Sequence, residues 1–524
     1  MCLTALITRC GPDLYERQAL NQKTVPRCDS GPSRSRTNQV EHDDDFFIGL
    51  KQSILLANRN SMRAALCRVA TVVGAHILLR GLSGEAADWP RFRGPNGSGV
   101  SEARDLPVEF GPGKNLAWKV NVPAGSSSPV IASDCVWLAG YEGNRRLVWC
   151  LDLKNGAQLW ERSIESVRTE RKSVPNDAAS STPVTDGSNA YVLFSDVGLV
   201  AYALDGRERW RVPLGPFTPP HGMSSSPILA GDVVVIVADQ IADSYIAAFD
   251  AASGKPRWKT PRPNFVGGYS TPVVCRGQVL VAGPLELVAY APITGKRLWS
   301  APKMGVMPIG SPVCHEDRVF VNNGAVPPFE SLAKELKADR NGDGKLTPDE
   351  FPDPSFKEAV LAIDRVYGNG DGAVDKAEWD GALKLMQTLN ALVAVQVEEL
   401  QPKELWRITK SLPDVPSPLL YQGVLYLLKD GGIMTSVDPE TGDVLRRERL
   451  VTGAEGRYFA SPVAGDGKIF AVSEAGKIAV VKAGREWELL TVNALGEECY
   501  ATPALAEKQI LVRTKRALWA FGGK

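Results

Sequence analysis

The sequence predicts an all-β chain: an eight-bladed β-propeller that is closed by both termini and carries one small α-helical insertion. Three observations lead to this prediction. A Ser-Pro or Thr-Pro pair followed by apolar residues recurs eight times, and a tight turn ending in tryptophan recurs between those pairs. One interval between pairs is about 60 residues too long. All-β rings of this length can form a single unit.

The spacing of the repeated pairs sets the size of each structural unit. Their prolines are Pro129, Pro183, Pro227, Pro272, Pro312, Pro418, Pro462 and Pro503. Most intervals are about 40 to 55 residues, the size of a four-stranded propeller blade. Alternating runs such as DVVVIVAD and RVFVNN supply strands. Eight copies favour eight blades, with seven as the alternative.

A second repeated element lies between the prolines. The segments LDLKNGAQLW, ALDGRERW, FDAASGKPRW and APITGKRLW end at Trp160, Trp210, Trp258 and Trp299, and degraded copies carry Trp406, Trp487 and, in place of tryptophan, Arg446. The Asp-x-x-x-Gly part forms a tight turn in which glycine adopts φ > 0. The tryptophan then begins the next strand, where it can pack between blades and bury a large area.

These turns resemble the pyrroloquinoline-quinone-type (PQQ-like) propeller repeat, whose blades carry A-x-D-x-x-T-G-x-x-x-W. The resemblance covers about residues 115 to 522. The segment DWPRFRGPNGSG, from Asp88, is similar to the start of secreted bacterial members of this group. The resemblance implies a propeller over residues 115–524, preceded by an extended lead-in over residues 88–114.

The two ends of the propeller segment indicate how the ring closes. The C-terminal YATPALAEKQILVRTKRALWAFGGK contains three strands without a fourth, and NLAWKVNV, with Trp118, contains a fourth strand without the first three. Pairing them completes an eighth blade and removes the exposed edges of a broken ring.

The N-terminal residues predict export. Residues 1–61 are polar and without periodicity, and we expect a disordered or non-native extension there. Residues 62–87 restart at Met62 and contain an apolar run of about eleven residues, which is too short to span a bilayer and fits a signal peptide. The alternative is a disordered tail with a stray apolar segment. Export predicts a periplasmic or extracellular protein without a transmembrane span, for which association with the envelope is open.

The balance of charge argues against nucleic acid and anionic membranes as partners, and the cysteine count limits the possible disulfides. Sixty basic residues balance sixty acidic ones, so no overall field favours nucleic acid or an anionic membrane. Cleavage would leave Cys135, Cys150, Cys275, Cys314 and Cys499, an odd number, so at least one thiol stays free or pairs between chains. Cys135 and Cys150 would lie on neighbouring strands and could form a bridge. Buried, unpaired cysteines are the favoured interpretation.

The long interval contains two calcium-type loops, within residues 325–390. In ADRNGDGKLTPDEF the ligand positions of an EF-hand fall on Asp339, Asn341, Asp343, Lys345 (through its carbonyl), Thr347 and Glu350. Leu346 is the apolar residue that would face a partner loop. The second loop keeps Asn369, Asp371, Asp375 and Glu378, but its first position is Tyr367, and Asp364 comes three residues too early unless the loop distorts. We therefore expect Ca²⁺ at one strong site and at one weak or unused site.

The insertion separates the second and third strands of one blade, which places it on the face that carries the blade-to-blade connections. Those connections surround one mouth of the central channel. Residues just before the Ser/Thr-Pro pairs would line it: Asn176, His221, Tyr269, Asp414, Arg457, Tyr458 and Tyr500. A protein or small-molecule ligand could bind there. His221 can equally be a solvated loop residue, and the tyrosines can pack between blades.

The resemblance also raises the question of catalysis. PQQ-dependent dehydrogenases use adjacent cysteines, an acidic base and a calcium ion on the channel axis. This chain has no Cys-Cys pair, and its strong calcium motif lies in an insertion. We assign no catalytic residue and do not expect PQQ. The favoured function is a non-catalytic, exported binding scaffold, as in the lipoprotein propeller that helps assemble outer-membrane barrels. A quinoprotein dehydrogenase and a structural envelope protein are the alternatives.

Overall fold

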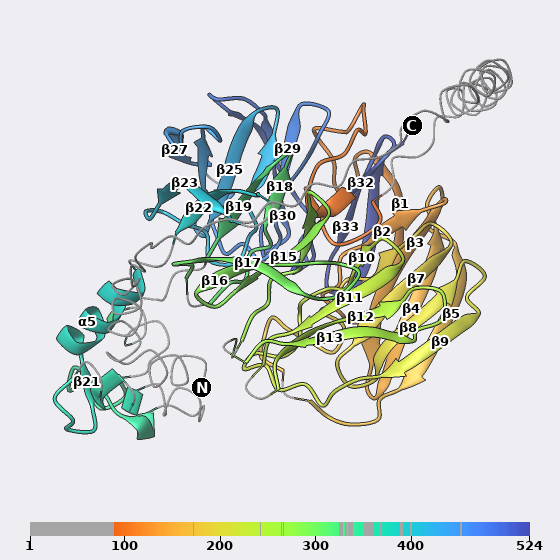
Figure 1. Ribbon diagram of the computed structural model, residues 1–524. Coiled ribbons are helices and arrows are strands. Elements are labelled where there is room, and N and C mark those ends of the chain that lie inside the picture. The colour runs from red at the N-terminus through yellow and green to blue at the C-terminus, as the bar shows by residue number, and fades with distance from the viewer. Residues whose placement is uncertain are drawn as a thin grey trace, which may run out of the picture. The chain divides into compact units, whose positions relative to one another are not determined.

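The computed structural model describes residues 89–523 apart from 171, 241–242, 264, 266, 306, 324–328, 331–332, 334–338, 351–359, 362, 366–367, 388–390, 399–400 and 451–452. In these residues the chain forms eight four-stranded antiparallel sheets, the blades of a β-propeller, and one two-stranded sheet (Figure 1). The predicted count of eight blades is confirmed. The proposed extension over residues 1–61 and signal peptide over residues 62–87 lie outside the described residues.

The first four blades follow one another directly along the chain. Blade 1 contains β2 (Val130–Ala132), β3 (Cys135–Glu142), β4 (Arg145–Asp152) and β5 (Gln158–Glu165). Blade 2 contains β6 (Val184–Thr185), β7 (Asn189–Phe194), β8 (Gly198–Ala203) and β9 (Glu208–Pro213). Blade 3 contains β10 (Ile228–Ala230), β11 (Val233–Ala238), β12 (Tyr245–Asp250) and β13 (Pro256–Pro261). Blade 4 contains β14 (Val273–Cys275), β15 (Gln278–Gly283), β16 (Glu286–Tyr290) and β17 (Arg297–Pro302).

The remaining blades include the interrupted one and the one that closes the ring. Blade 5 contains β18 (Val313–His315), β19 (Arg318–Asn322), β22 (Leu392–Gln396) and β23 (Lys403–Ile408). Blade 6 contains β24 (Leu419–Tyr421), β25 (Val424–Lys429), β26 (Ile433–Val437) and β27 (Val444–Arg449). Blade 7 contains β28 (Val463–Gly465), β29 (Lys468–Val472), β30 (Lys477–Lys482) and β31 (Glu488–Ala494). Blade 8 contains β32 (Ala504–Ala506), β33 (Gln509–Arg513), β34 (Ala517–Gly522) and β1 (Leu116–Asn121).

The short first strands form the inner wall of the ring. They contact one another in blade order, as in the pairs β2–β6, β18–β24 and β28–β32, and β32 contacts β2 across the closure. The second and third strands of most blades are apolar and almost fully buried, whereas fourth strands such as β9 alternate between exposed and half-buried residues. The hydrophobic core therefore lies between neighbouring blades, in clusters that draw on two or three blades each.

The ring closes as predicted. Strand β1 pairs antiparallel with β34, with Val120 opposite Leu518 and Asn121 opposite Ala517. The indole Nε1 of Trp118 then donates to the carbonyl of Leu153 in blade 1, at 2.9 Å. The N-terminal strand thus joins the last blade and contacts the first.

The repeated tryptophans join successive blades in the same way. Trp160 donates to Leu204 O at 2.7 Å and Trp210 donates to Ala251 O at 2.9 Å, each in the following blade. The glycine of the following turn lies against each indole, so a Cβ on Gly254 would come within 2.7 Å of the Trp210 ring. Packing of tryptophan between blades is therefore confirmed.

Blade 6 uses a different contact where tryptophan is missing. Arg446 Nη1 donates to the carbonyl of Trp487 at 2.6 Å, and the guanidinium lies 4.4 Å from the centroid of the Trp487 ring. A cation–π contact replaces the indole contact at this boundary.

The insertion interrupts blade 5 between β19 and β22, which pair directly with each other, so its predicted place between the second and third strands is correct. It contains β20 (Lys345–Leu346), η3 (Pro348–Glu350), β21 (Val374–Asp375) and α5 (Lys376–Gln387). Leu346 pairs with Val374, and both side chains are fully buried. The apolar residue of the first loop faces the second loop, as expected.

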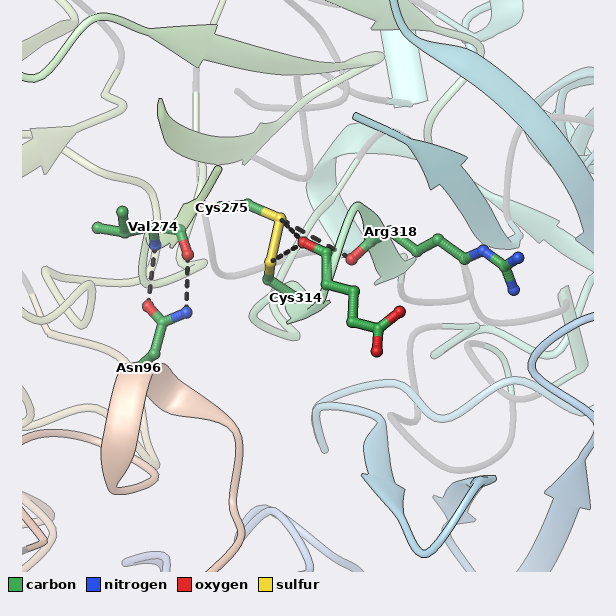
Figure 2. Close-up of a disulfide and its surroundings, with 6 residues drawn as sticks. Asn96, Val274, Cys275, Cys314 and Arg318 are labelled. Atoms are coloured by element: carbon green, nitrogen blue, oxygen red, sulfur yellow. Dashed lines mark hydrogen bonds between the residues drawn. A yellow bond between two sulfur atoms is a disulfide. The ribbon is translucent and has the colours of Figure 1, made fainter. Parts of the chain in front are cut away.

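A disulfide joins Cys275 on β14 to Cys314 on β18, in neighbouring blades (Figure 2). The sequence did not predict this bond, because the two residues belong to different repeats. Cys135 and Cys150 lie on the adjacent strands β3 and β4, as expected, and are unpaired and buried, as is Cys499. In the part of the chain that is described, no helix has the length and apolarity needed to cross a bilayer.

Candidate functional site at the channel axis

The lead-in, residues 89–114, crosses one face of the ring. This face carries the turns that join the first and second strands of each blade. Trp89 exchanges two backbone hydrogen bonds of 2.9 Å with Ile131 in blade 1. Asn96 bonds through both atoms of its amide to the backbone of Val274 in blade 4, beside the disulfide (Figure 2). Gly99 accepts from Ala464 in blade 7 at 2.7 Å, and Arg104 donates to Glu507 in blade 8 at 3.1 Å. The lead-in therefore ties together blades from opposite parts of the ring.

Two arginines of the lead-in are buried in the channel. Arg91 is 5% exposed and donates from Nη2 to Pro272 O at 2.5 Å; Arg93 is 0% exposed and donates from Nη2 to Pro418 O at 2.6 Å. Burial lowers the pKa of Arg91 to about 9, and burial and then the charge of Arg91 lower the pKa of Arg93 to about 9. Both guanidiniums therefore keep their charge at neutral pH. Neither forms an ion pair within the described residues.

Phe92, between these arginines, closes one side of an axial cavity of about 120 Å³. The other side is the mouth formed by the blade-to-blade segments. The lining combines hydroxyl, amide and apolar groups: Phe92, Ser126, Ser128, Pro175, Asn176, Ser180, Thr182, Ser224, Ser226, Tyr269, Thr271, Ile309, Ser311, Val415, Ser417, Phe459, Ser461, Tyr500 and Thr502. Apart from tyrosine, none of these residues has an ionisable side chain.

The hydroxyl residues before the repeated prolines form a closed ring of hydrogen bonds. The backbone N–H of each donates to the hydroxyl of the next blade's residue: Ser128 to Thr182 (2.9 Å), Thr182 to Ser226 (2.9 Å), Ser226 to Thr271 (3.0 Å), Thr271 to Ser311 (3.0 Å), Ser311 to Ser417 (2.9 Å), Ser417 to Ser461 (3.0 Å), Ser461 to Thr502 (3.0 Å) and Thr502 to Ser128 (3.0 Å). We call these eight residues the hydroxyl ring. All eight belong to the Ser-Pro and Thr-Pro pairs of the sequence repeat, but the sequence did not predict that they bond to one another.

The sequence-predicted mouth residues separate into two groups. Asn176, Tyr269 and Tyr500 line the cavity. His221, Asp414, Arg457 and Tyr458 do not. His221 contacts two lining residues through its backbone: its N–H donates to the Tyr269 hydroxyl at 3.2 Å, and its carbonyl accepts from the Asn176 amide at 3.1 Å. The side chain of Tyr458 is 2% exposed and packs among apolar residues of blades 6 and 7, because its position alternates with that of the lining Phe459.

Aromatic and acidic groups surround the mouth. The Arg457 guanidinium lies 4.7 Å from the centroid of Phe459, whose ring is 5.4 Å from that of Tyr500. The Tyr500 hydroxyl donates to Glu474 at 3.1 Å, and burial together with this contact raises the pKa of Tyr500 to about 12. The Ser126 hydroxyl donates to Asp177 at 2.7 Å. Tyr500 therefore remains a neutral donor, and the mouth carries two hydrogen-bonded carboxylates.

The carboxylates of the first loop accept hydrogen bonds from the loop's own backbone, and no three acidic, cysteine or histidine side chains among the described residues are gathered as metal ligands. Asp339 accepts from the N–H groups of Gly342 (2.7 Å) and Gly344 (3.1 Å), and Glu350 accepts from Arg340 (3.0 Å) and Thr347 (2.7 Å). Partial burial by itself would raise the pKa of Glu350, but the hydrogen bonds from Thr347 and Arg340 outweigh it and lower that pKa. The carboxylate is thus kept ionised.

The second loop repeats this pattern from an earlier residue. Asp364 accepts from the N–H groups of Gly370 (2.8 Å) and Gly372 (2.9 Å), which correspond to Gly342 and Gly344 of the first loop. Gly368 donates to the Asp364 carbonyl at 2.9 Å, and a Cβ on Gly368 would lie 2.7 Å from that oxygen. The loop therefore makes the distortion that would bring Asp364 into the first ligand position.

The remaining ligand candidates of this loop follow the first loop. Glu378 accepts from Asn369 (2.9 Å) and Asp375 (3.0 Å), as Glu350 does from Arg340 and Thr347. Asp371 accepts from Ala373 at 2.9 Å and forms an ion pair of 2.8 Å with Lys345 of the first loop. Oxygen ligands of these types suit Ca²⁺.

The axial cavity does not suit a quinone cofactor with its calcium ion. Its volume of about 120 Å³ is well below the roughly 300 Å³ at which small-molecule sites begin. None of its lining residues is a carboxylate or a cysteine. The hydroxyl and amide groups of the lining suit a small polar group.

Comparison with known proteins identifies the repeat. The family model described as "Outer membrane protein assembly factor BamB" matches residues 171–326 and 385–522, more than half of the chain. No curated protein sequence matches.

Several solved structures share the fold. BamB from Moraxella catarrhalis is 13% identical, with a TM-score of 0.50, and the match covers 78% of this chain and 98% of that one. A europium-containing methanol dehydrogenase is 11% identical, with a TM-score of 0.55 and coverages of 83% and 98%. The quinohemoprotein alcohol dehydrogenase of Comamonas testosteroni is 11% identical, with a TM-score of 0.52 and coverages of 84% and 81%.

Proposed function

This chain belongs to the family of the outer membrane protein assembly factor BamB. From this family membership we propose that it is an exported, non-catalytic scaffold that binds an envelope protein at the channel mouth. The observation that carries the proposal is the lining of the axial cavity. Hydroxyl, amide and aromatic groups recognise a partner, but a reaction needs an acid, a base or a nucleophile of suitable pKa. The described lining has none except tyrosine, and Tyr500 has a pKa of about 12.

Two further features support export. The disulfide between Cys275 and Cys314 is of the kind that forms and persists in oxidising compartments. The sequence pattern of residues 62–87 is that of a signal peptide, which would address the chain to such a compartment.

We further propose that the insertion binds Ca²⁺ in both loops, more tightly in the first. The first loop has the regular spacing of ligands from Asp339 to Glu350. The second reaches its first ligand, Asp364, by a loop three residues longer, and more chain must be ordered when the ion binds. Because the insertion leaves a single blade, we expect calcium to order it without being required for the propeller to fold.

The second candidate function is that of a quinoprotein dehydrogenase. The structural similarity to methanol and alcohol dehydrogenases is the reason to consider it. A titration separates the two functions. Purified residues 88–524 are mixed with pyrroloquinoline quinone and Ca²⁺, and the absorbance of bound quinone and dye-linked alcohol oxidation are measured. A scaffold gives no saturable absorbance change and no oxidation. Saturable binding with turnover would replace the scaffold proposal with the dehydrogenase.

A further inference from the structure

The hydroxyl ring has hydrogen-bonding capacity that the protein does not use. Each of its oxygens accepts one N–H from the neighbouring blade. Each hydroxyl also has a proton to donate. Among the residues that the structure describes, none of these protons has a protein acceptor. All eight residues line the axial cavity and are at most 3% exposed. The cavity is therefore surrounded by hydroxyl donors.

Three buried positive charges bind carbonyls directly beside ring members. The carbonyls that bind Arg91 and Arg93 belong to Pro272 and Pro418, the residues directly after the ring members Thr271 and Ser417. A third guanidinium, that of Arg513, is 1% exposed and donates to Ser127 O at 2.8 Å, directly before the ring member Ser128.

These three cations have no carboxylate within ion-pair distance among the described residues. In the described chain none of the three forms an ion pair, and the Nε atoms of all three have no hydrogen-bond partner. Buried charge is normally paired. The two carboxylates near the mouth, Asp177 and Glu474, accept hydrogen bonds from Ser126 and Tyr500 at the rim. Burial lowers the pKa of Arg513, but the charge of Asp177 also acts on this group and raises that pKa. Arg91 and Arg93 therefore contribute the least compensated positive charge beside the cavity.

We propose that the hydroxyl ring binds a single oxyanion group on the channel axis. Several oxygens on one small group can accept from several ring hydroxyls at once, and hydrogen bonds to a charged acceptor are the stronger kind. The buried guanidiniums favour negative charge there through the low-dielectric wall without touching the ligand. A cavity of about 120 Å³ admits a phosphate ion or the carboxylate tip of a larger molecule, not a whole cofactor.

This inference rests on the proposed function only in taking the axis as a binding surface. Oxyanion binding can fail while a protein partner still binds at the mouth, and the titration below contains no partner protein. Its result is therefore separate from that of the scaffold experiment.

The test is calorimetry of residues 88–524 with inorganic phosphate and, separately, with acetate, at constant pH and ionic strength. We expect one saturable site for which the two anions compete, and the tighter anion distinguishes a free phosphate from a carboxylate-bearing ligand. Absence of saturable binding of both anions up to 50 mM overturns the proposal.

Ring threonines provide matched variants. Thr271→Val keeps the shape of the side chain and removes one hydroxyl, whereas Thr271→Ser keeps the hydroxyl. Loss of one charge-assisted hydrogen bond predicts at least about tenfold weaker binding for Thr271→Val and less than about threefold for Thr271→Ser. Equal affinity of the valine variant and the wild type would contradict the assignment. If Thr271→Val does not fold, Thr182→Val gives the same decision.

Discussion

The backbone N–H of Thr502 donates to the hydroxyl of Ser128 at 3.0 Å, across 374 positions of sequence. This contact is the last of the eight in the hydroxyl ring and joins blade 8 to blade 1. A second contact joins the same two blades on the outside of the ring, where the indole of Trp118 donates to the carbonyl of Leu153. Closure therefore involves both the innermost and the outermost strands, and β1 covers the edge that β34 would otherwise expose.

Removing the outer contact should destabilise the whole ring. Trp118→Ala deletes an indole that is 7% exposed, and we expect a loss of about 3–5 kcal/mol in the free energy of unfolding. The control is Leu159→Ala on β5, a side chain that is 52% exposed, which should change that free energy by less than about 0.5 kcal/mol. Chemical denaturation of both variants measures the difference. Similar values for the two would mean that the closure carries little stability.

Two glycines isolate the contribution of tryptophan packing between blades. Gly277 and Gly295 both have positive φ, of 72° and 68°. An added Cβ at Gly277 would meet no atom within 4 Å, whereas at Gly295 it would lie 2.3 Å from the Trp258 ring. Gly277→Ala should cost about 1–2 kcal/mol for its backbone alone. Gly295→Ala should cost about 1–3 kcal/mol more, because the indole must move. Thermal unfolding that ranks them in the opposite order would contradict the packing argument.

Calcium binding should involve two unequal sites. Glu350→Gln removes bidentate coordination in the first loop and should abolish the tighter site. Glu378→Gln and Asp364→Asn should each abolish the weaker site and leave the tighter one unchanged. Calorimetry with Ca²⁺ measures both. If Asp364→Asn leaves two sites intact, Asp364 is not the first ligand of the second loop.

The cysteines give a count that can be measured directly. Burial raises the pKa of the Cys499 thiol to about 12, and Cys135 and Cys150 are also buried, so a thiol reagent should not react with native residues 88–524 at neutral pH. After denaturation without reductant, three thiols should react. One reactive thiol would mean that Cys135 and Cys150 are bridged, and five would mean that the Cys275–Cys314 disulfide is absent.

Much of the fold could be predicted because each repeat is marked by residues that lie close together in the sequence. A glycine in each turn and a tryptophan after it define the blade boundary, and strand pairing within a blade follows from neighbouring segments. The closure by Trp118 was predictable because three strands at one end lacked a fourth. The disulfide was not, since Cys275 and Cys314 become neighbours only when first strands of different blades pack side by side.

The site was harder to predict than the fold. Residues before the repeated prolines were expected to line the mouth, and Tyr269 and Tyr500 do, but Tyr458 points into the blade because side chains alternate along an extended segment. Arg91 and Arg93 gave no signal in sequence, because their importance depends on burial beneath the ring. The hydrogen bonds that Asp364 accepts from Gly370 and Gly372 depend on a loop shape that spacing alone does not reveal.

Site-specific photocrosslinking tests the scaffold proposal most directly. A benzoylphenylalanine at Tyr500, which lines the mouth, is compared with one at Leu159, on the outer strand of blade 1, in envelope extract with calcium and with chelator. We predict a discrete protein adduct from position 500 that weakens with chelator, and none from position 159. The absence of an adduct from position 500 under either condition would contradict the proposal that this mouth binds an envelope protein.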